Sequence, residues 1–160
     1  MRRNLLGCLI LAAMPLVAAP AFANCNENQV ELRGDWGSAR FRVAIADEVH
    51  ERAQGLMHVP ELPRLGGMLF IYDHPQRVSF WMENTLIPLD MIFADETGQV
   101  VNVHTDAIPM DRTPIPGGSD DILYVLEVNA GTAETFGIGP GTQLRHASVA
   151  QEIAVWPCSE

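Results

Sequence analysis

Trp81, Asn84 and Asp90 are the residues whose types and spacing point most directly to a binding site. They lie within FWMENTLIPLDMIF, an apolar stretch that an amide and carboxylates interrupt. Small-ligand sites combine apolar walls with a few polar groups that fix the orientation of the ligand. We therefore expect these three side chains to border a pocket. Alternatively, Asn84 and Asp90 satisfy the backbone groups of a buried loop, which is a structural role.

Three charged residues outside this stretch could add to the same pocket. Glu51 and Arg52 lie in a predicted short helix, and Glu127 interrupts the apolar segment YVLEV. Because Glu127 shares a predicted strand face with Val125, its carboxylate requires a partner, and Arg52 is the expected counter-ion. This pair either belongs to the binding site or ties the helix to the sheet.

Two pairs of carboxylates could support catalysis. Glu83 with Asp90, or Glu51 with Glu127, could act as acid and base on a glycosidic bond if about 5–10 Å separated their carboxyl groups. The sequence has no nucleophile elbow, zinc-protease helix or phosphate-binding glycine loop. The leading interpretation is a non-catalytic binding module for a small molecule or peptide segment. A hydrolase-like enzyme is the first alternative, and a structural or interaction module without a pocket is the second.

Methionine and histidine could form a soft metal site. Met57-His58, followed by Met68, is similar in composition to Cu(I) sites of periplasmic carriers, in which soft ligands select the ion. Several methionines, however, fall at predicted core positions, and methionine packs well in irregular cores. We therefore expect core methionines, with no metal site and no cofactor.

The first 23 residues have the features of a secretory signal. Arg2-Arg3 precedes an apolar stretch, and Ala21-Phe22-Ala23 fits the small-x-small rule for cleavage. The apolar run is shorter than the ~20 residues that span a bilayer, so a membrane anchor is the weaker interpretation. We expect residues 1–23 to be a cleaved signal peptide and residues 24–160 to be a single domain. The mature protein is then periplasmic or secreted, without membrane association.

The charge of the chain limits its partners. Acidic residues outnumber basic ones by 20 to 10, there is no lysine, and the formal net charge is −10. Such a surface repels phosphate backbones, so nucleic acid is not an expected partner. Basic peptides, cationic small molecules and metal ions remain compatible with it. We expect a monomer.

Two cysteines, Cys25 and Cys158, lie near the two ends of the predicted domain. In an oxidising compartment this arrangement favours one disulfide, because the termini of a domain are often close in space. The alternative is that both cysteines lie on frayed ends and do not pair.

Short strands dominate the predicted secondary structure. Strands are predicted over 39–45, 68–72, 78–82, 90–94, 99–104, 122–128, 142–148 and 153–156, and short helices after a cap at Asp47 and over 131–136. Proline and glycine predict an irregular loop over residues 108–121, which could be the rim or lid of the pocket. Most connections are too short for parallel crossovers. We therefore expect an α+β fold, with a mainly antiparallel, strongly curled sheet or small barrel and two short helices.

Four motifs, in the same order, resemble the bacterial and archaeal family known as domain of unknown function 192. They are ERAQGLM at 51–57, GMLF at 67–70, FWMENTLIPLD at 80–90 and YVLEVNAG at 124–131. The resemblance covers about residues 40–144 and implies a small, often exported domain with no established activity. That family commonly has a basic residue at the position of Glu83, so a role of that cation does not transfer to this chain.

Overall fold

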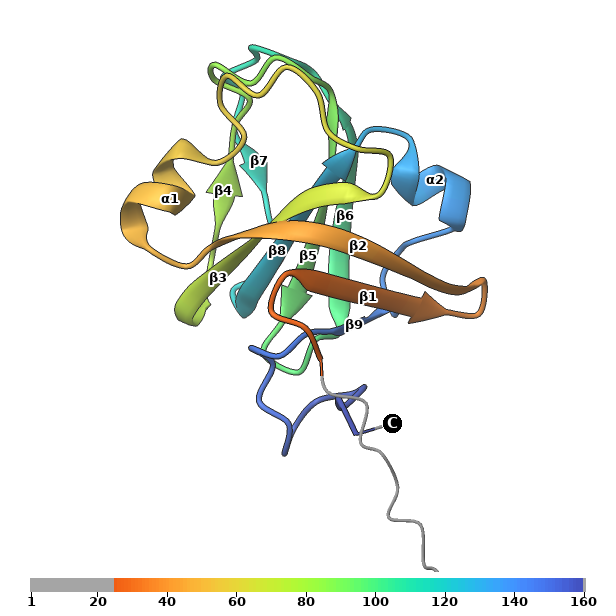
Figure 1. The fold of residues 1–160 in the computed structure, drawn as a ribbon. Coiled ribbons are helices and arrows are strands. Elements are labelled where there is room, and N and C mark those ends of the chain that lie inside the picture. The colour runs from red at the N-terminus through yellow and green to blue at the C-terminus, as the bar shows by residue number, and fades with distance from the viewer. Residues whose placement is uncertain (1–24, 160) are drawn as a thin grey trace, which may run out of the picture.

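Seven strands form one strongly curled sheet in the computed structural model, which describes residues 25–159 (Figure 1). The order across the sheet is β6-β5-β8-β3-β2-β1-β9, and β4 and β7 form a separate two-stranded ribbon. The elements, in chain order, are β1 (Gln29–Gly34), β2 (Gly37–Ala46), α1 (Val49–Gln54), β3 (Gly66–Gln76), β4 (Ser79–Phe80), β5 (Leu89–Asp95), β6 (Val100–Ala107), β7 (Ile115–Pro116), β8 (Ile122–Asn129), α2 (Thr132–Phe136) and β9 (Gln143–Arg145).

Neighbouring strands in the sheet run antiparallel, except β2 and β3. These two are parallel because α1 and the loop after it return the chain to the start of β3, the kind of crossover that parallel neighbours require. The edges of the sheet approach each other, since Gln99, just before β6, forms a bridge with Gln143 in β9. The expected α+β fold with a mainly antiparallel, strongly curled sheet and two short helices is confirmed. The parallel pair departs from the expectation.

Apolar side chains on the two faces of the central strands form two separate cores. In β8, Tyr124, Leu126 and Val128 belong to the first core, and Val125 belongs to the second. Strands buried on both faces have nearly continuous apolar sequences, which explains why β8 shows so little alternation. Glu127 lies on the same side of β8 as Val125 and therefore faces the second core.

The helix α1 begins at a capping box and ends at a glycine. The N-cap is Glu48, whereas the sequence favours Asp47, and the Glu51 carboxylate accepts a hydrogen bond of 3.2 Å from the Glu48 backbone N–H. Gly55 ends the helix with a φ of 49°, and a Cβ there would lie 3.2 Å from the ring of Phe70. Glycine thus permits both the left-handed backbone and the close packing of the helix end on β3.

Other elements also differ from the sequence-based expectations. β1 has no predicted counterpart, the strand predicted over 78–82 is reduced to β4, and residues 153–156 form no strand. Trp156 instead packs between the guanidinium groups of Arg33 and Arg145, which lie 4.3 and 4.1 Å from its ring centroid. These contacts hold the last segment against the sheet without strand pairing.

A disulfide joins Cys25 to Cys158, with a Cα–Cα distance of 5.4 Å. The two ends of the described chain accordingly lie near each other, below β9 in Figure 1. The predicted pairing is confirmed.

The predicted signal peptide, residues 1–23, lies outside the described residues. Within residues 25–159, no helix is long and apolar enough to cross a bilayer.

Candidate ligand-binding site

A cleft of about 270 Å³ lies between α1 and the segment that starts at β4, over the face of β3 and β8. Three of the predicted site residues, Arg52, Trp81 and Glu127, line it together. Its apolar walls are Leu56, Met57, Phe70, Phe80 and Trp81. A concave, aromatic-rich site with few polar groups is the usual design for small ligands.

Glu127 is the most unusual group in this cleft. The residue is only 4% exposed, and its carboxyl group has no hydrogen bond or ion pair within the part of the chain that the structure describes. Its neighbours across the sheet are Met68 on β3 and Met91 on β5, which offer no charge. Burial raises the pKa of Glu127 from 4.5 to about 8. The carboxyl group is therefore mainly protonated at neutral pH.

Arg52 does not form the expected ion pair with Glu127, and that expectation is wrong. Its guanidinium donates hydrogen bonds to the backbone carbonyl groups of Asp47 and Ile71, the second at 2.8 Å. It also lies 3.7 Å from a carboxylate oxygen of Asp73 and 5.3 Å from the ring centroid of Tyr72. The five N–H donors of arginine allow backbone carbonyls to replace the carboxylate as partners.

Tyr72 is a cleft residue that the sequence-based interpretation missed. Burial raises the pKa of its hydroxyl, Arg52 lowers it and Glu127 raises it, so the hydroxyl lies within electrostatic range of both charged groups. Phe70 was missed in the same way. The signal was present, since Met68, Phe70 and Tyr72 alternate along β3 and share the face on which the cleft lies.

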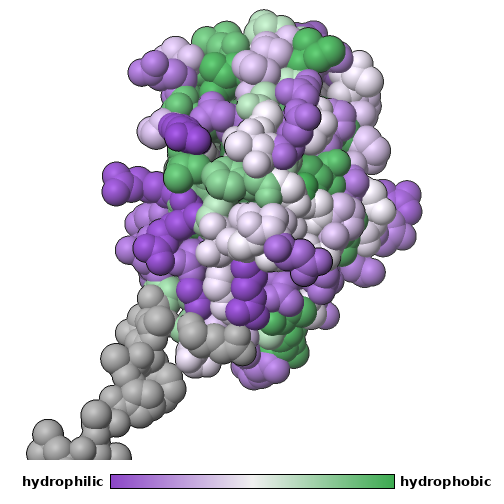
Figure 2. Space-filling model, turned by 90° about the vertical axis from the view of Figure 1, so that its right-hand side faces the viewer, coloured by the Kyte–Doolittle hydropathy of each residue, from purple (hydrophilic) through white to green (hydrophobic). Residues whose placement is uncertain are grey.

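The rim beside the cleft is apolar and exposed. Trp81, Leu86, Ile108 and Met110 are each at least half exposed. Two hydrogen bonds join their loops, from the Met110 N–H to the Thr85 carbonyl (3.1 Å) and from the Met82 N–H to the Asp111 carbonyl (2.8 Å). Figure 2 shows hydrophobic residues at the upper end of the molecule, where Figure 1 places the connecting loops.

Residues 108–121 brace this segment and do not line the cleft. Arg112 forms an ion pair of 2.6 Å with Glu83, and β7 pairs with β4. Ile108 and Met110 of this loop thus lie in the rim, and the rest of the loop holds in place the segment that carries Trp81.

Asn84 and Glu51 have local roles beside the cleft. Asn84 has a φ of 54°, a left-handed conformation that asparagine tolerates, and its carbonyl accepts a hydrogen bond of 2.8 Å from the His58 N–H. Glu51 forms the capping box of α1. Neither side chain lines the cleft.

Asp90 faces away from the cleft. Its side chain is fully buried, and its two carboxylate oxygens accept hydrogen bonds from the backbone N–H groups of Asp106 (3.0 Å) and Ala133 (2.8 Å). Asp90 thus joins β6 and the first turn of α2 to β5. This arrangement corresponds to the structural alternative for Asp90.

Replacing Asp90 by alanine should lower the free energy of unfolding by about 2–6 kcal/mol, because each of two backbone N–H groups loses an acceptor worth about 1–3 kcal/mol. Urea denaturation measures the loss. Asp106→Asn is the matched control, since it keeps the backbone N–H that binds Asp90 and an asparagine suits the φ of 54° at this position. Equal stability of Asp90→Ala and the control would contradict this role.

The carboxylate pairs considered for catalysis do not converge. Of Glu51, Glu83, Asp90 and Glu127, only Glu127 lines the cleft. Among the described residues, no group of three or more histidine, cysteine, aspartate or glutamate side chains could hold a metal ion. The cleft therefore presents one buried carboxyl group amid aromatic walls.

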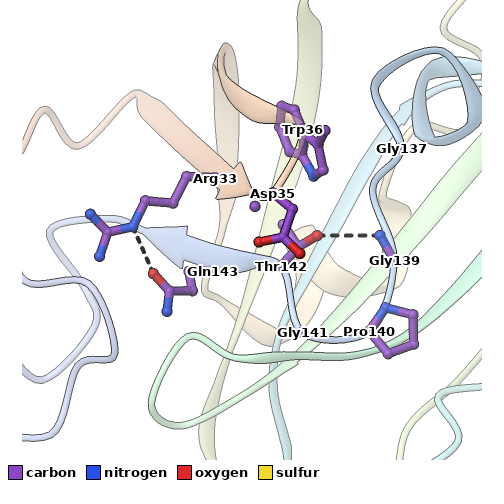
Figure 3. Close-up of a pocket in the computed structure, with 10 residues that line it drawn as sticks. Arg33, Asp35, Trp36, Gly137, Gly139, Pro140, Gly141, Thr142 and Gln143 are labelled. Carbon is purple, nitrogen blue, oxygen red and sulfur yellow. Dashed lines mark hydrogen bonds between the residues drawn. The ribbon is translucent and has the colours of Figure 1, made fainter.

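A second cleft, of about 470 Å³, lies between the β1–β2 turn and the glycine-rich turn before β9 (Figure 3). Three of its backbone N–H groups are used within the fold: Gly137 donates to the carbonyl of Ala133, Gly141 to the carbonyl of Val100, and Gly139 to the hydroxyl of Thr142. The charged side chains that line it are not buried. It therefore lacks the buried charged group that distinguishes the cleft at Glu127.

Two solved structures are similar to this chain over most of its length. A protein of unknown function from Novosphingobium aromaticivorans DSM 12444 is 40% identical, and the match covers 73% of this chain and 83% of that protein, with a TM-score of 0.71. A Sinorhizobium meliloti 1021 protein, proposed to be a transcription regulator, is 34% identical, and the match covers 78% and 96%, with a TM-score of 0.72. No curated protein matches the chain.

The family model described as DUF192, an uncharacterized ACR, matches residues 30–146. This range contains the sheet except Gln29, both helices and every residue that lines the cleft at Glu127. The resemblance carried by the four sequence motifs is thus confirmed, and the chain belongs to the DUF192 family.

Proposed function

We propose that this protein is an exported, non-catalytic binding domain whose cleft at Glu127 holds a small molecule or a peptide segment. The observation that supports this proposal is the carboxyl group of Glu127, which is buried in a cleft and has no partner among residues 25–159. Burying such a group destabilises a fold, and groups with strongly perturbed pKa values gather at functional sites. A ligand with a complementary group would provide the partner that the fold does not.

The cleft supports binding better than glycoside hydrolysis. The usual hydrolytic mechanism places two carboxyl groups on opposite sides of one bond. Here one carboxyl group lines the cleft, and the side chains of Glu51, Glu83 and Asp90 have partners elsewhere.

The size of the cleft sets the size of the group that enters it. A volume of about 270 Å³ equals that of about nine water molecules at ~30 Å³ each. This is just below the usual range of about 300–1,000 Å³ for small-molecule sites. The occupant is therefore a small compound, or one side chain of a longer peptide.

A thermal-shift screen with small amines, carboxylic acids, amides and sugars tests the proposal. Binding to the native state stabilises it by about 2.7 kcal/mol at a ligand concentration 100 times the Kd. We expect at least one class to raise the Tm of the wild type, and Trp81→Ala to weaken that binding about tenfold or more by removing an aromatic wall. The folding stability of Trp81→Ala should change little, because the side chain is half exposed.

Leu86→Ala is the matched control for Trp81→Ala, since Leu86 is equally exposed on the same segment but does not line the cleft. If no class raises the Tm, or if the shifts survive in Trp81→Ala, the cleft is not the binding site and the proposal fails.

A further inference from the structure

We propose that the cleft selects a small organic cation, namely a primary ammonium group on an apolar stem. The group is presented by a free amine or by the side chain of a lysine. This inference rests on the proposed function, because it names the chemical class of the occupant of that same cleft.

The first argument is the balance of donors and acceptors. Two of the donors that line the cleft are already used, since Arg52 donates to backbone carbonyls and the Thr85 hydroxyl donates to the carbonyl of Glu83 (3.3 Å). Within the described residues, the carboxyl group of Glu127 has no donor. Neither of these donors points to Glu127, so a ligand can supply the donor that its carboxylate requires, and an ammonium group brings three N–H donors together with the matching charge.

The second argument is the aromatic surface around that carboxyl group. Phe70 and Phe80 meet edge to face, with ring centroids 5.1 Å apart, and Tyr72 and Trp81 line the same cleft. The faces of aromatic rings attract cations, and tryptophan does so most strongly. The protein already uses one of these rings in this way, because the guanidinium of Arg52 lies 5.3 Å from the centroid of Tyr72.

The third argument concerns charge. The chain has 20 acidic and 10 basic residues, so its overall field raises the local concentration of cations. Arg52 lies on the α1 side of the cleft and opposes a second positive charge there. A ligand with a single ammonium group at Glu127 and an apolar stem against the aromatic walls is attracted by the acidic chain and places no second positive charge beside Arg52.

Binding has a defined proton balance. Glu127 is mainly protonated below a pKa of about 8, so an ammonium ligand displaces one proton when the carboxylate forms. Affinity should then rise with pH, by up to about tenfold per unit below pH 8, and level off above it. The other titratable groups of the cleft are Arg52 and Tyr72, while His104 on β6 is separated from Glu127 by Met91.

Isothermal titration calorimetry at pH 6, 7, 8 and 9 tests the inference. The probes are phenethylamine, its anionic analogue 3-phenylpropionate and its neutral analogue 2-phenylethanol. Nα-acetyl-lysinamide distinguishes a lysine side chain from a free amine. We expect one phenethylamine per chain, at least tenfold tighter binding than the two analogues, and proton release when two buffers with different ionisation enthalpies are compared. Tighter binding of Nα-acetyl-lysinamide assigns the site to a lysine side chain, and weaker binding assigns it to a free amine.

Two variants complete the test. Glu127→Gln should weaken amine binding at least tenfold and abolish its rise with pH. Glu134→Gln makes the same substitution at an exposed residue on α2, outside the cleft, and should bind like the wild type. Equal binding of the amine to both variants would overturn the inference.

The outcomes separate this inference from the proposed function. If 3-phenylpropionate or 2-phenylethanol binds more tightly than the amine and Trp81→Ala weakens that binding, the inference of a cationic ligand is wrong. The proposed function as a binding domain is then retained. If neither these probes nor the thermal-shift classes bind, both proposals fail.

Discussion

Replacing Glu127 by glutamine is expected to raise the free energy of unfolding at pH 8 and to leave it nearly unchanged at pH 5. In the folded protein burial raises the pKa of Glu127 from 4.5 to about 8. Between these values the unfolded chain has lost the proton while the folded chain retains it. The wild type therefore loses stability as the pH rises through this window, at up to about 1.4 kcal/mol per pH unit.

The expected difference between the two proteins is on the order of 4 kcal/mol between pH 5 and pH 8. Glutamine is similar in shape and never ionises, so its own contribution is independent of pH. Urea unfolding of both proteins at pH 5, 6, 7 and 8 measures this difference. The comparison also cancels the contribution of His146 to the pH dependence, which is the same in both proteins. Burial is the main cause of the lowered pKa of His146, so its contribution to stability rises with pH below its ordinary value of 6.5.

Glu134→Gln serves as the control here too, because an exposed carboxylate on α2 should leave the pH profile unchanged. If the curves of Glu127→Gln and the wild type run parallel from pH 5 to pH 8, Glu127 is ionised in the folded protein. In that case a partner compensates its charge in the absence of any ligand, and the main argument for the cleft is lost.

This pH dependence connects stability to binding. At neutral pH the folded chain retains a proton that the unfolded chain has released, and the fold is weakened for as long as Glu127 lacks a partner. A cationic ligand that pairs with the ionised carboxylate recovers part of this free energy. The burial of Glu127 therefore leads us to expect both a lower free energy of unfolding without ligand and a higher one when a cationic ligand is bound.

Three of the six site residues predicted from the sequence, Arg52, Trp81 and Glu127, line the cleft. Glu127 was identifiable because a carboxylate within YVLEV is out of place on a buried strand. Asp90 was misplaced relative to the cleft because β5 is buried on both faces, so no polar alternation shows which way each side chain points. Leu89 and Met91 face the core beneath the cleft, and Asp90, between them, faces α2.

The fold was predictable where the pattern is local. Short strands with close turns gave the antiparallel pairs, the curled sheet and the two helices. The parallel pairing of β2 with β3 depends on how α1 packs, which no local pattern encodes. The irregular path of residues 153–156 likewise depends on Trp156, which contacts two arginines from neighbouring strands that are far apart in the sequence.

The largest single loss of stability is expected when the disulfide is removed. Cys25 and Cys158 are 133 residues apart in the sequence, so the bond restricts nearly the whole unfolded chain. In the chain-entropy model, closing a loop of this length contributes about 5 kcal/mol, which is the upper end of the usual range for one disulfide. We expect the double variant Cys25→Ser/Cys158→Ser to unfold at a markedly lower urea concentration than the wild type.

Dithiothreitol provides the matched control, since it should lower the stability of the wild type to that of the double variant and leave the variant unchanged. Trp156→Ala in both backgrounds then tests how the last segment is held. Arg33, Arg145 and the disulfide all hold this segment near β1 and β9. Together they offset the conformational entropy that the segment loses when it is ordered. We therefore expect Trp156→Ala to cost more in the double variant, where the packing of Trp156 and the hydrogen bond from the Val155 N–H to the Thr97 carbonyl remain. Equal unfolding midpoints for the wild type and the double variant would show that this packing alone closes the loop and that the disulfide adds nothing.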